Sequence, residues 1–270
     1  MYNDFFHFRE SPFNITADPD FFFSSTRHSE AFAHLIYGIQ QRKGILVVTG
    51  EIGTGKTMLC RTLLNRLDEK TKTALILNPS FSDLQLLQII LKDLGIKTNA
   101  RNKFALIDAL NAFLLEETSQ GNNVVLIIDE AQNLKEKQLE QVRLLSNLET
   151  EKEKLLQIIL VGQPELLEKL KLPTLRQLNQ RVTVRFHMLP LDKDELKDYI
   201  VHRLKVASAN GKQGINFTDK AIESIFELSQ GTPRMVNILS DRALLAGYVA
   251  ETHTIDEKIV HQCAREVIKQ

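Results

Sequence analysis

The chain of 270 residues is 43% hydrophobic and 25% charged, proportions typical of a folded globular protein and not of a disordered one. Its 34 basic residues equal its 34 acidic residues, so no overall positive field attracts nucleic acid or an anionic membrane. The length favours a core domain accompanied by a smaller second domain.

Three features predict a cytoplasmic protein without a membrane span. The phenylalanine-rich start, Met1–Glu10, is interrupted by polar residues such as Asp4, so it lacks the apolar core of a signal peptide. The longest apolar runs, such as Val124–Ile128, are far shorter than the ~20 residues that a membrane-spanning helix needs. The two cysteines, Cys60 and Cys263, match no metal-ligand spacing and are interpreted as reduced thiols.

Residues 1–28 are predicted to form an irregular segment that wraps on the surface of a domain. Two prolines and scattered phenylalanines between positions 5 and 23 show neither helical nor strand period. His28, Phe13 and Asn14 are candidates for lining an adenine pocket, although packing in a core explains Phe13 equally well.

A helix is expected next, with Gly44 at its exit, because Phe32, Leu35, Ile36 and Ile39 have the i, i+3, i+4, i+7 spacing of one buried face. Short apolar runs of β type then alternate with helix-period stretches, a pattern typical of a parallel sheet with crossover helices. The five runs are Ile45–Thr49, Ala74–Leu77, Val124–Ile128, Gln157–Val161 and Val182–Phe186. Two groups of leucines at helical spacing, one ending at Leu94 and the other at Leu114, predict two amphipathic helices between the second and third runs. The predicted architecture is an α/β core over residues 1–190.

Beyond Pro190 the β-type runs stop, and a small all-helical lid domain is predicted over residues 191–270. Its helix-period segments are Lys193–Ala209, Asp219–Ser229, Arg234–Val249 and Glu257–Ile268. From Met188 onward, 11 basic residues face 12 acidic ones, which argues against a dedicated DNA-reading module.

The strongest motif directly follows the first apolar run and matches the phosphate-loop pattern G-x-x-x-x-G-K-[ST]. It consists of Gly50, Glu51, Ile52, Gly53, Thr54, Gly55, Lys56 and Thr57, and Met58 follows it at the start of the next helix. Glycines let the backbone turn its N–H groups towards a phosphate, and the helix directs its positive end at the same place. Lys56 suits the β- and γ-phosphates of ATP, and the Thr57 hydroxyl suits Mg²⁺.

The third apolar run ends in two carboxylates, Asp129 and Glu130. The carboxyl ends of parallel strands form the ligand-binding edge of an open α/β sheet. Asp129 therefore suits the Mg²⁺ shell, and Glu130 suits the polarisation of a water that attacks the γ-phosphate. After the fourth run, Gln163 offers an amide to the same chemistry, although before Pro164 it is explained equally well as a turn residue.

Three arginines are further candidates. Arg176 and Arg181 flank the start of the fifth run, where a guanidinium could reach a nucleotide held by a neighbouring subunit. Arg234 follows Pro233 at a predicted helix start, where a cation opposes the helix dipole, so a functional reason for its presence is favoured.

In order, the segments GEIGTGKT, LIIDEAQNL, ILVGQPEL, LRQLNQRVTVRFHMLPL and GTPRMVN resemble those of AAA+ ATPases. With the opening MYNDFFHFRESPFNITADPDFFFSS they resemble the ExeA-like branch, the general secretion pathway protein A ATPases, over nearly the whole chain. The resemblance implies a P-loop AAA+ core with a five-stranded parallel sheet and a helical lid. It also implies Walker A at Gly50–Thr57, Walker B at Asp129 and Glu130, and sensor 1 near Gln163. An arginine finger is best matched by Arg181, with Arg176 competing, and sensor 2 by Arg234. Gln163 departs from the more usual Asn or Thr.

The resemblance implies an ATP-binding and ATP-hydrolysing protein that uses Mg²⁺ and supports assembly of a cell-envelope secretion, pilus or exopolysaccharide export system. It would form a nucleotide-dependent homo-oligomer, contact a protein of that machinery, and lie in the cytoplasm or at the inner face of the cytoplasmic membrane. Larger relatives continue into a transmembrane helix and a peptidoglycan-binding domain, so this chain is either a compact relative or a piece of a longer protein. An ATP-dependent DNA-binding regulator of the transposition-ATPase type is the alternative, which the neutral charge disfavours. A scaffold that does not hydrolyse ATP is a third interpretation, against which Glu130 argues.

Overall fold

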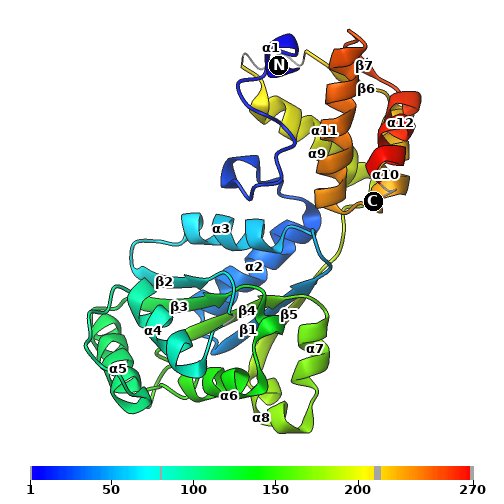
Figure 1. Ribbon diagram of the computed structural model, residues 1–270. Helices are drawn as coiled ribbons and strands as arrows, with labels where there is room; N and C mark the ends of the chain where they lie inside the picture. Colours follow the sequence, from blue (N-terminus) through cyan, green and yellow to red (C-terminus); the bar gives the residue numbers. More distant parts are fainter. Residues whose placement is uncertain (1, 80, 210–213, 268–270) are drawn as a thin grey trace. The chain divides into compact units, whose positions relative to one another are not determined.

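The computed structural model describes residues 2–79, 81–209 and 214–267 (Figure 1). The chain folds into two compact units, and each is built from segments that are not contiguous in the sequence. The α/β unit comprises Glu30–Ile52 and Thr62–Met188, and the helical unit comprises Met1–Ser29, Gly53–Arg61 and Leu189–Gln270. No helix among the described residues is both long enough and apolar enough to cross a lipid bilayer.

The α/β unit contains a parallel sheet with the strand order β2-β3-β4-β1-β5, which confirms the predicted five-stranded sheet. The strands are β1 (Ile45–Gly50), β2 (Thr71–Ile76), β3 (Asn123–Ile128), β4 (Gln157–Gly162) and β5 (Val182–Met188). Every residue of the central strands β1 and β4 is buried, whereas the edge strands β2 and β5 alternate between more and less buried positions. Burial on both faces explains why the central strands are continuous apolar runs in the sequence.

Helices cover both faces of this sheet (Figure 1). Ile45 and Val47 of β1 share a core with helices of one face. Leu46 points to the other face and packs closely on Gly38 of α2. The helices of the unit are α2 (Thr26–Gln40), α4 (Asp83–Asp93), α5 (Lys103–Ser119), α6 (Glu136–Leu145), α7 (Glu165–Leu170) and α8 (Arg176–Gln180), with 3-10 turns η2 (Ala131–Asn133) and η3 (Pro173–Leu175). The two amphipathic helices expected between the second and third strands are α4 and α5.

The end of α2 differs from the expected exit at Gly44. Arg42 is the residue in the left-handed region, with φ of 48°. The N–H of Lys43 donates to the carbonyl of Gly38 at 2.8 Å, and the N–H of Arg42 donates to that of Ile39 at 3.1 Å. These two bonds form a Schellman motif, which normally favours glycine at the left-handed position.

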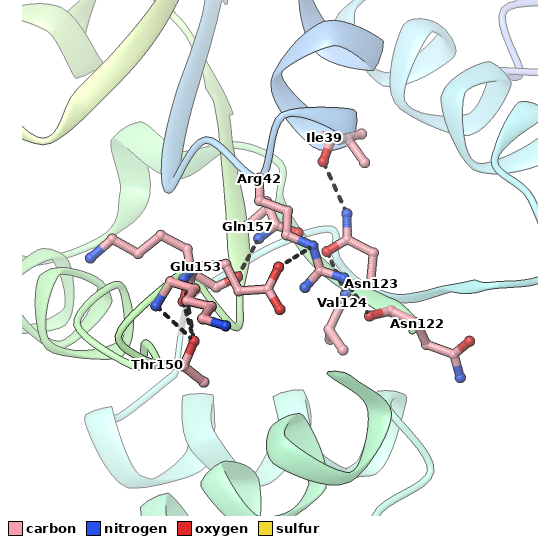
Figure 2. Close-up of polar contacts among 10 residues, drawn as sticks. Ile39, Arg42, Asn122, Asn123, Val124, Thr150, Glu153 and Gln157 are labelled. Atoms are coloured by element: carbon pink, nitrogen blue, oxygen red, sulfur yellow. Dashed lines mark hydrogen bonds and ion pairs between the residues drawn. The ribbon is translucent and has the colours of Figure 1, made fainter. Parts of the chain in front are cut away.

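Contacts of the guanidinium explain how an arginine occupies that position (Figure 2). Arg42 donates through Nη2 to the carbonyl of Asn122 at 3.0 Å and pairs through Nε with Glu153 at 3.2 Å. The neighbouring Asn123 donates to the carbonyl of Ile39 at 3.0 Å. The end of α2 is thereby joined to the start of β3 and to the turn before β4.

Over residues 191–209 and 214–267, the helical unit contains four longer helices, which confirms the expected helical region. They are α9 (Lys193–Ala207), α10 (Asp219–Ser229), α11 (Pro233–Val249) and α12 (Glu257–Val267); Ile268, the predicted end of the last, lies outside the described residues. A parallel pairing of β6 (Asn216–Phe217) with β7 (Thr254–Ile255) was not predicted, because two-residue strands are too short to show a period. The division of the chain at residue 190 stays a prediction.

The N-terminal segment is part of the core of the helical unit, so the prediction that it wraps on a domain surface is wrong. The segment contains the short helix α1 (Tyr2–Phe5) and the 3-10 turn η1 (Pro19–Phe21). Four of its aromatic side chains are buried in the core of the helical unit: Phe6, Phe8, Phe13 and Phe21. Arg203 of α9, only 2% exposed, donates to the carbonyls of Pro12 and Asn14 at 2.5 and 2.9 Å. These long-range contacts fix a segment that has no periodic pattern of its own.

Candidate functional site

The phosphate-loop motif lies between a buried strand and the start of a helix. β1 ends at Gly50, and α3 (Lys56–Arg66) begins at the motif lysine, which is 6% exposed. Gly53 and Gly55 have φ of 82° and 94°, in the left-handed region that favours glycine. The loop therefore turns sharply into the N-terminus of an 11-residue helix, the end at which the helix dipole favours an anion.

The surroundings of the two glycines also fit a close-packed phosphate loop. A Cβ on Gly53 would lie 2.7 Å from Cβ of Arg234, and one on Gly55 would lie 3.1 Å from Nε2 of His28. The N–H of Arg234 donates to the carbonyl of Gly53 at 3.2 Å, while its side chain is exposed. Within the helical unit the structure thus brings together the phosphate loop, the start of α11 and His28.

His28 is a buried neighbour of the loop. It is 6% exposed, and its Nδ1 lies 2.8 Å from the hydroxyl of Ser25. Burial lowers the pKa of His28 below its ordinary value, against smaller opposing contributions from a hydrogen bond with the backbone of Thr54 and from the carboxylate of Glu195. Phe13 packs edge-on against Phe217 in the helical core, so core packing accounts for it.

Asp129 and Glu130 follow β3 at the carboxyl edge of the sheet, the edge at which β1 ends in Gly50. Asp129 is 2% exposed, and its Oδ1 accepts the N–H of Glu130 at 2.9 Å. Glu130 has φ of 53°, which is uncommon for a residue with a side chain and is concentrated at functional sites. The chain leaves the strand direction at this residue.

The structure brings Gln163 to Glu130, and it adds a residue that the sequence did not indicate. Gln163 donates from Nε2 to Oε2 of Glu130 at 3.4 Å, and Gln132 donates from Nε2 to the same oxygen at 2.5 Å. Oε1 of Gln132 accepts the backbone N–H of Gln163 at 3.1 Å. The only signal for Gln132 in the sequence is an amide two residues after the carboxylates.

Arg181 lies at the amino edge of the sheet of its own chain and not at the carboxyl edge. Arg181 immediately precedes β5, and Val182 is in register with Ile45 at the start of β1. The phosphate loop leaves β1 at Gly50, five residues or about 16 Å further along the strand. The guanidinium of Arg181 donates to the side chain of Asn147, and Arg176 begins the short helix α8.

Comparisons with known proteins agree with this arrangement. Residues 39–170 match a family model described as "AAA domain". General secretion pathway protein A of Aeromonas hydrophila is 44% identical over 269 residues, which cover 97% of this chain and 47% of that protein, so the chain spans about half the length of this relative.

Two solved structures share the fold. The ORC2 protein of Aeropyrum pernix in its ADP form is 15% identical, with a TM-score of 0.68 and coverage of 96% of this chain and 73% of that chain. Cdc6p of Pyrobaculum aerophilum is 18% identical, with a TM-score of 0.68 and coverage of 93% and 71%. At these identities the likeness shows the fold alone.

Proposed function

We propose that this chain, which is similar over nearly its whole length to general secretion pathway protein A and matches an AAA domain over residues 39–170, is an AAA+ protein that binds and hydrolyses ATP to support assembly of a cell-envelope secretion, pilus or exopolysaccharide export system. The observation that carries the proposal is the phosphate loop between β1 and α3, together with a carboxylate pair at the edge of the same sheet.

The residues divide into phosphate binding, metal binding and water activation. The backbone of Gly50–Met58 and the Lys56 ammonium would hold the phosphates, and Thr57 and Asp129 carry the oxygen ligands that Mg²⁺ prefers. Mg²⁺, when bound, neutralises charge on the phosphate oxygens. Glu130 would orient and polarise the attacking water, with the Gln163 amide beside it, and Arg234 would act as the cation of the helical unit.

A trans-acting arginine is proposed because of where the fifth strand starts. Arg181 precedes the amino end of β5, at the edge opposite to the phosphate loop, so it suits the nucleotide of a neighbouring subunit better than its own. Arg176 is the alternative. Such a finger requires a homo-oligomer whose assembly depends on nucleotide, which in turn would act on a protein of the envelope machinery at the inner face of the cytoplasmic membrane.

The test is the steady-state ATPase rate as a function of protein concentration, for wild type, Lys56→Ala and Glu130→Gln. The rate per subunit should rise with concentration, and Glu130→Gln should bind ATP without turnover. Lys56→Ala should lose affinity because it removes the charge that faces the phosphates. Equal nucleotide affinity in wild type and Lys56→Ala would refute the phosphate-loop assignment.

The finger is tested by mixing two inactive variants. Arg181→Ala and Glu130→Gln subunits should regain turnover when mixed, because an interface between them can combine an intact glutamate with an intact arginine. The same mixture with Arg176→Ala in place of Arg181→Ala tests the alternative finger. If neither arginine variant restores turnover when mixed with Glu130→Gln, neither arginine acts in trans. A rate that appears only when DNA is added would favour the DNA-dependent alternative instead.

A further inference from the structure

One amide side chain connects the ends of two neighbouring strands. Gln132 lies in the 3-10 turn after β3, donates from Nε2 to Oε2 of Glu130 at 2.5 Å, and accepts at Oε1 the N–H of Gln163, just after β4, at 3.1 Å. The two partners fix the orientation of the amide, because a flipped amide would set its oxygen against the carboxylate and its NH₂ group against an N–H donor.

The turn that carries this amide is itself held in place. Lys169 of α7 donates from Nζ to the carbonyls of Gln132 and Leu134 at 2.5 and 2.8 Å. Gly162, the last residue of β4, leaves the room that the amide occupies, because a Cβ there would lie 2.8 Å from Oε1 of Gln132. The bridge is therefore built into the fold of the α/β unit and is not a chance contact of a free side chain.

From this geometry we infer that Gln132 is a positioning residue that fixes the carboxylate of Glu130 relative to the end of β4. The inference rests on the proposed function, because the orientation of Glu130 matters to a reaction only if this carboxylate acts on the attacking water. A glutamate side chain has several rotamers of similar energy, and a restraint on it removes that disorder before the reaction begins.

The side-chain amide of Gln163 contributes less to this restraint. Its contact with Oε2 of Glu130 is 3.4 Å long, near the limit of a hydrogen bond, whereas that of Gln132 is 2.5 Å. Gln163 serves the bridge mainly through its backbone N–H, which any residue except proline supplies.

The test compares Gln132→Ala and Gln132→Glu with Gln138→Ala. Gln138 is a matched control because it is 1% exposed and uses both ends of its amide, accepting from the N–H of Lys135 at 2.8 Å and donating to the carbonyl of Phe81 at 2.9 Å. Neither of these bonds involves the carboxylate of Glu130. ATP turnover and the affinity for a non-hydrolysable ATP analogue are measured for each variant, across pH 5–9.

Gln132→Ala should lower kcat by about tenfold or more while the analogue affinity stays within about twofold. Gln132→Glu keeps an acceptor for the N–H of Gln163 but sets a second carboxylate against Glu130. Two adjoining carboxylates cannot both ionise freely, so the acid limb of the rate–pH profile should move to higher pH. Gln138→Ala should keep the wild-type kcat and profile.

The inference is overturned if Gln132→Ala turns over ATP as wild type does, or if Gln138→Ala loses as much. If Gln132→Ala does not fold, an unshifted profile in Gln132→Glu overturns it equally. Glu130→Gln, measured in parallel, separates the two levels of failure. If Glu130→Gln abolishes turnover but the Gln132 variants keep it, only the inference about Gln132 is refuted. If wild type itself shows no turnover, the proposed function is refuted, and the inference about Gln132 with it.

Discussion

Replacement of Arg42 tests how the end of α2 is held. Arg42→Ala and Arg42→Gly both remove the hydrogen bond to the carbonyl of Asn122 and the ion pair with Glu153 (Figure 2). They differ in the backbone, because alanine at φ of 48° stays in a disfavoured conformation and glycine does not. The order of the two variants therefore separates the side-chain contribution from the backbone contribution.

The expected loss is modest and can be divided. A hydrogen bond from a charged donor contributes about 1.5–3 kcal/mol, and a partly exposed ion pair about 0.5 kcal/mol. Nη1 of Arg42 is buried without a hydrogen-bond partner among the described residues, and its removal returns about 1 kcal/mol. Arg42→Ala should thus lower the free energy of unfolding by about 1–2.5 kcal/mol, and Arg42→Gly should be about 1 kcal/mol more stable than Arg42→Ala.

Urea titration followed by far-UV circular dichroism measures both variants against wild type. Glu153→Gln is the control, since it removes only the charge and should change the free energy of unfolding by less than about 0.5 kcal/mol. An Arg42→Ala protein as stable as Arg42→Gly would show that the left-handed residue carries no strain. Two variants as stable as wild type would show that the contacts of the Arg42 side chain drawn in Figure 2 contribute nothing to stability.

Three further predictions concern residues of the helical unit, and the first uses a control residue in the α/β unit. Gly53→Ala should lower the free energy of unfolding by about 2–4 kcal/mol, and Gly95→Ala should lower it by about 1 kcal/mol. Both glycines have a positive φ, but of the two only Gly53 lacks room for a Cβ. Equal losses of the two variants in urea titrations would contradict the close packing at Gly53. Because burial lowers the pKa of His28 in the folded chain, the unfolded chain binds a proton at His28 more readily as the pH falls below about 6.5. The part of the free energy of unfolding that depends on neutral His28 is present above that pH and should be lost below it. His28→Gln should reduce this slope in unfolding measurements between pH 5 and 8, and an unchanged slope would exclude His28 as its source. Arg203→Met should speed tryptic cleavage at Arg9, because the N-terminal segment loses two charge-assisted hydrogen bonds; an unchanged cleavage rate would show that the aromatic core alone holds it.

The parts of the fold that the sequence predicted are those with a local cause. Strands buried on both faces appear as apolar runs, and the observed β3, Asn123–Ile128, differs from the predicted Val124–Ile128 by one residue. The phosphate loop is recognisable because glycines at fixed spacing meet a conformational need of the backbone. The strand order β2-β3-β4-β1-β5 has no comparable local signal, since it depends on where each crossover helix returns to the sheet.

The features that were missed depend on contacts between distant residues. Arg42 ends α2 in place of Gly44 because Asn122 and Glu153, far along the chain, hold its side chain. Gln132 belongs to the site because the ends of β3 and β4 lie side by side. Neither relation leaves a periodic pattern or a short motif behind.

The aromatic N-terminal segment has a consequence for the order of events during synthesis. Phe6, Phe8, Phe13 and Phe21 leave the ribosome long before the helices that bury them, α9–α12. Until those helices have emerged, these rings have no native core to enter, and exposed apolar surface of this kind promotes aggregation and recruits chaperones. Shortening the chain at Met188 would make that temporary exposure permanent, so a fragment containing the whole sheet should be less soluble than the longer chain.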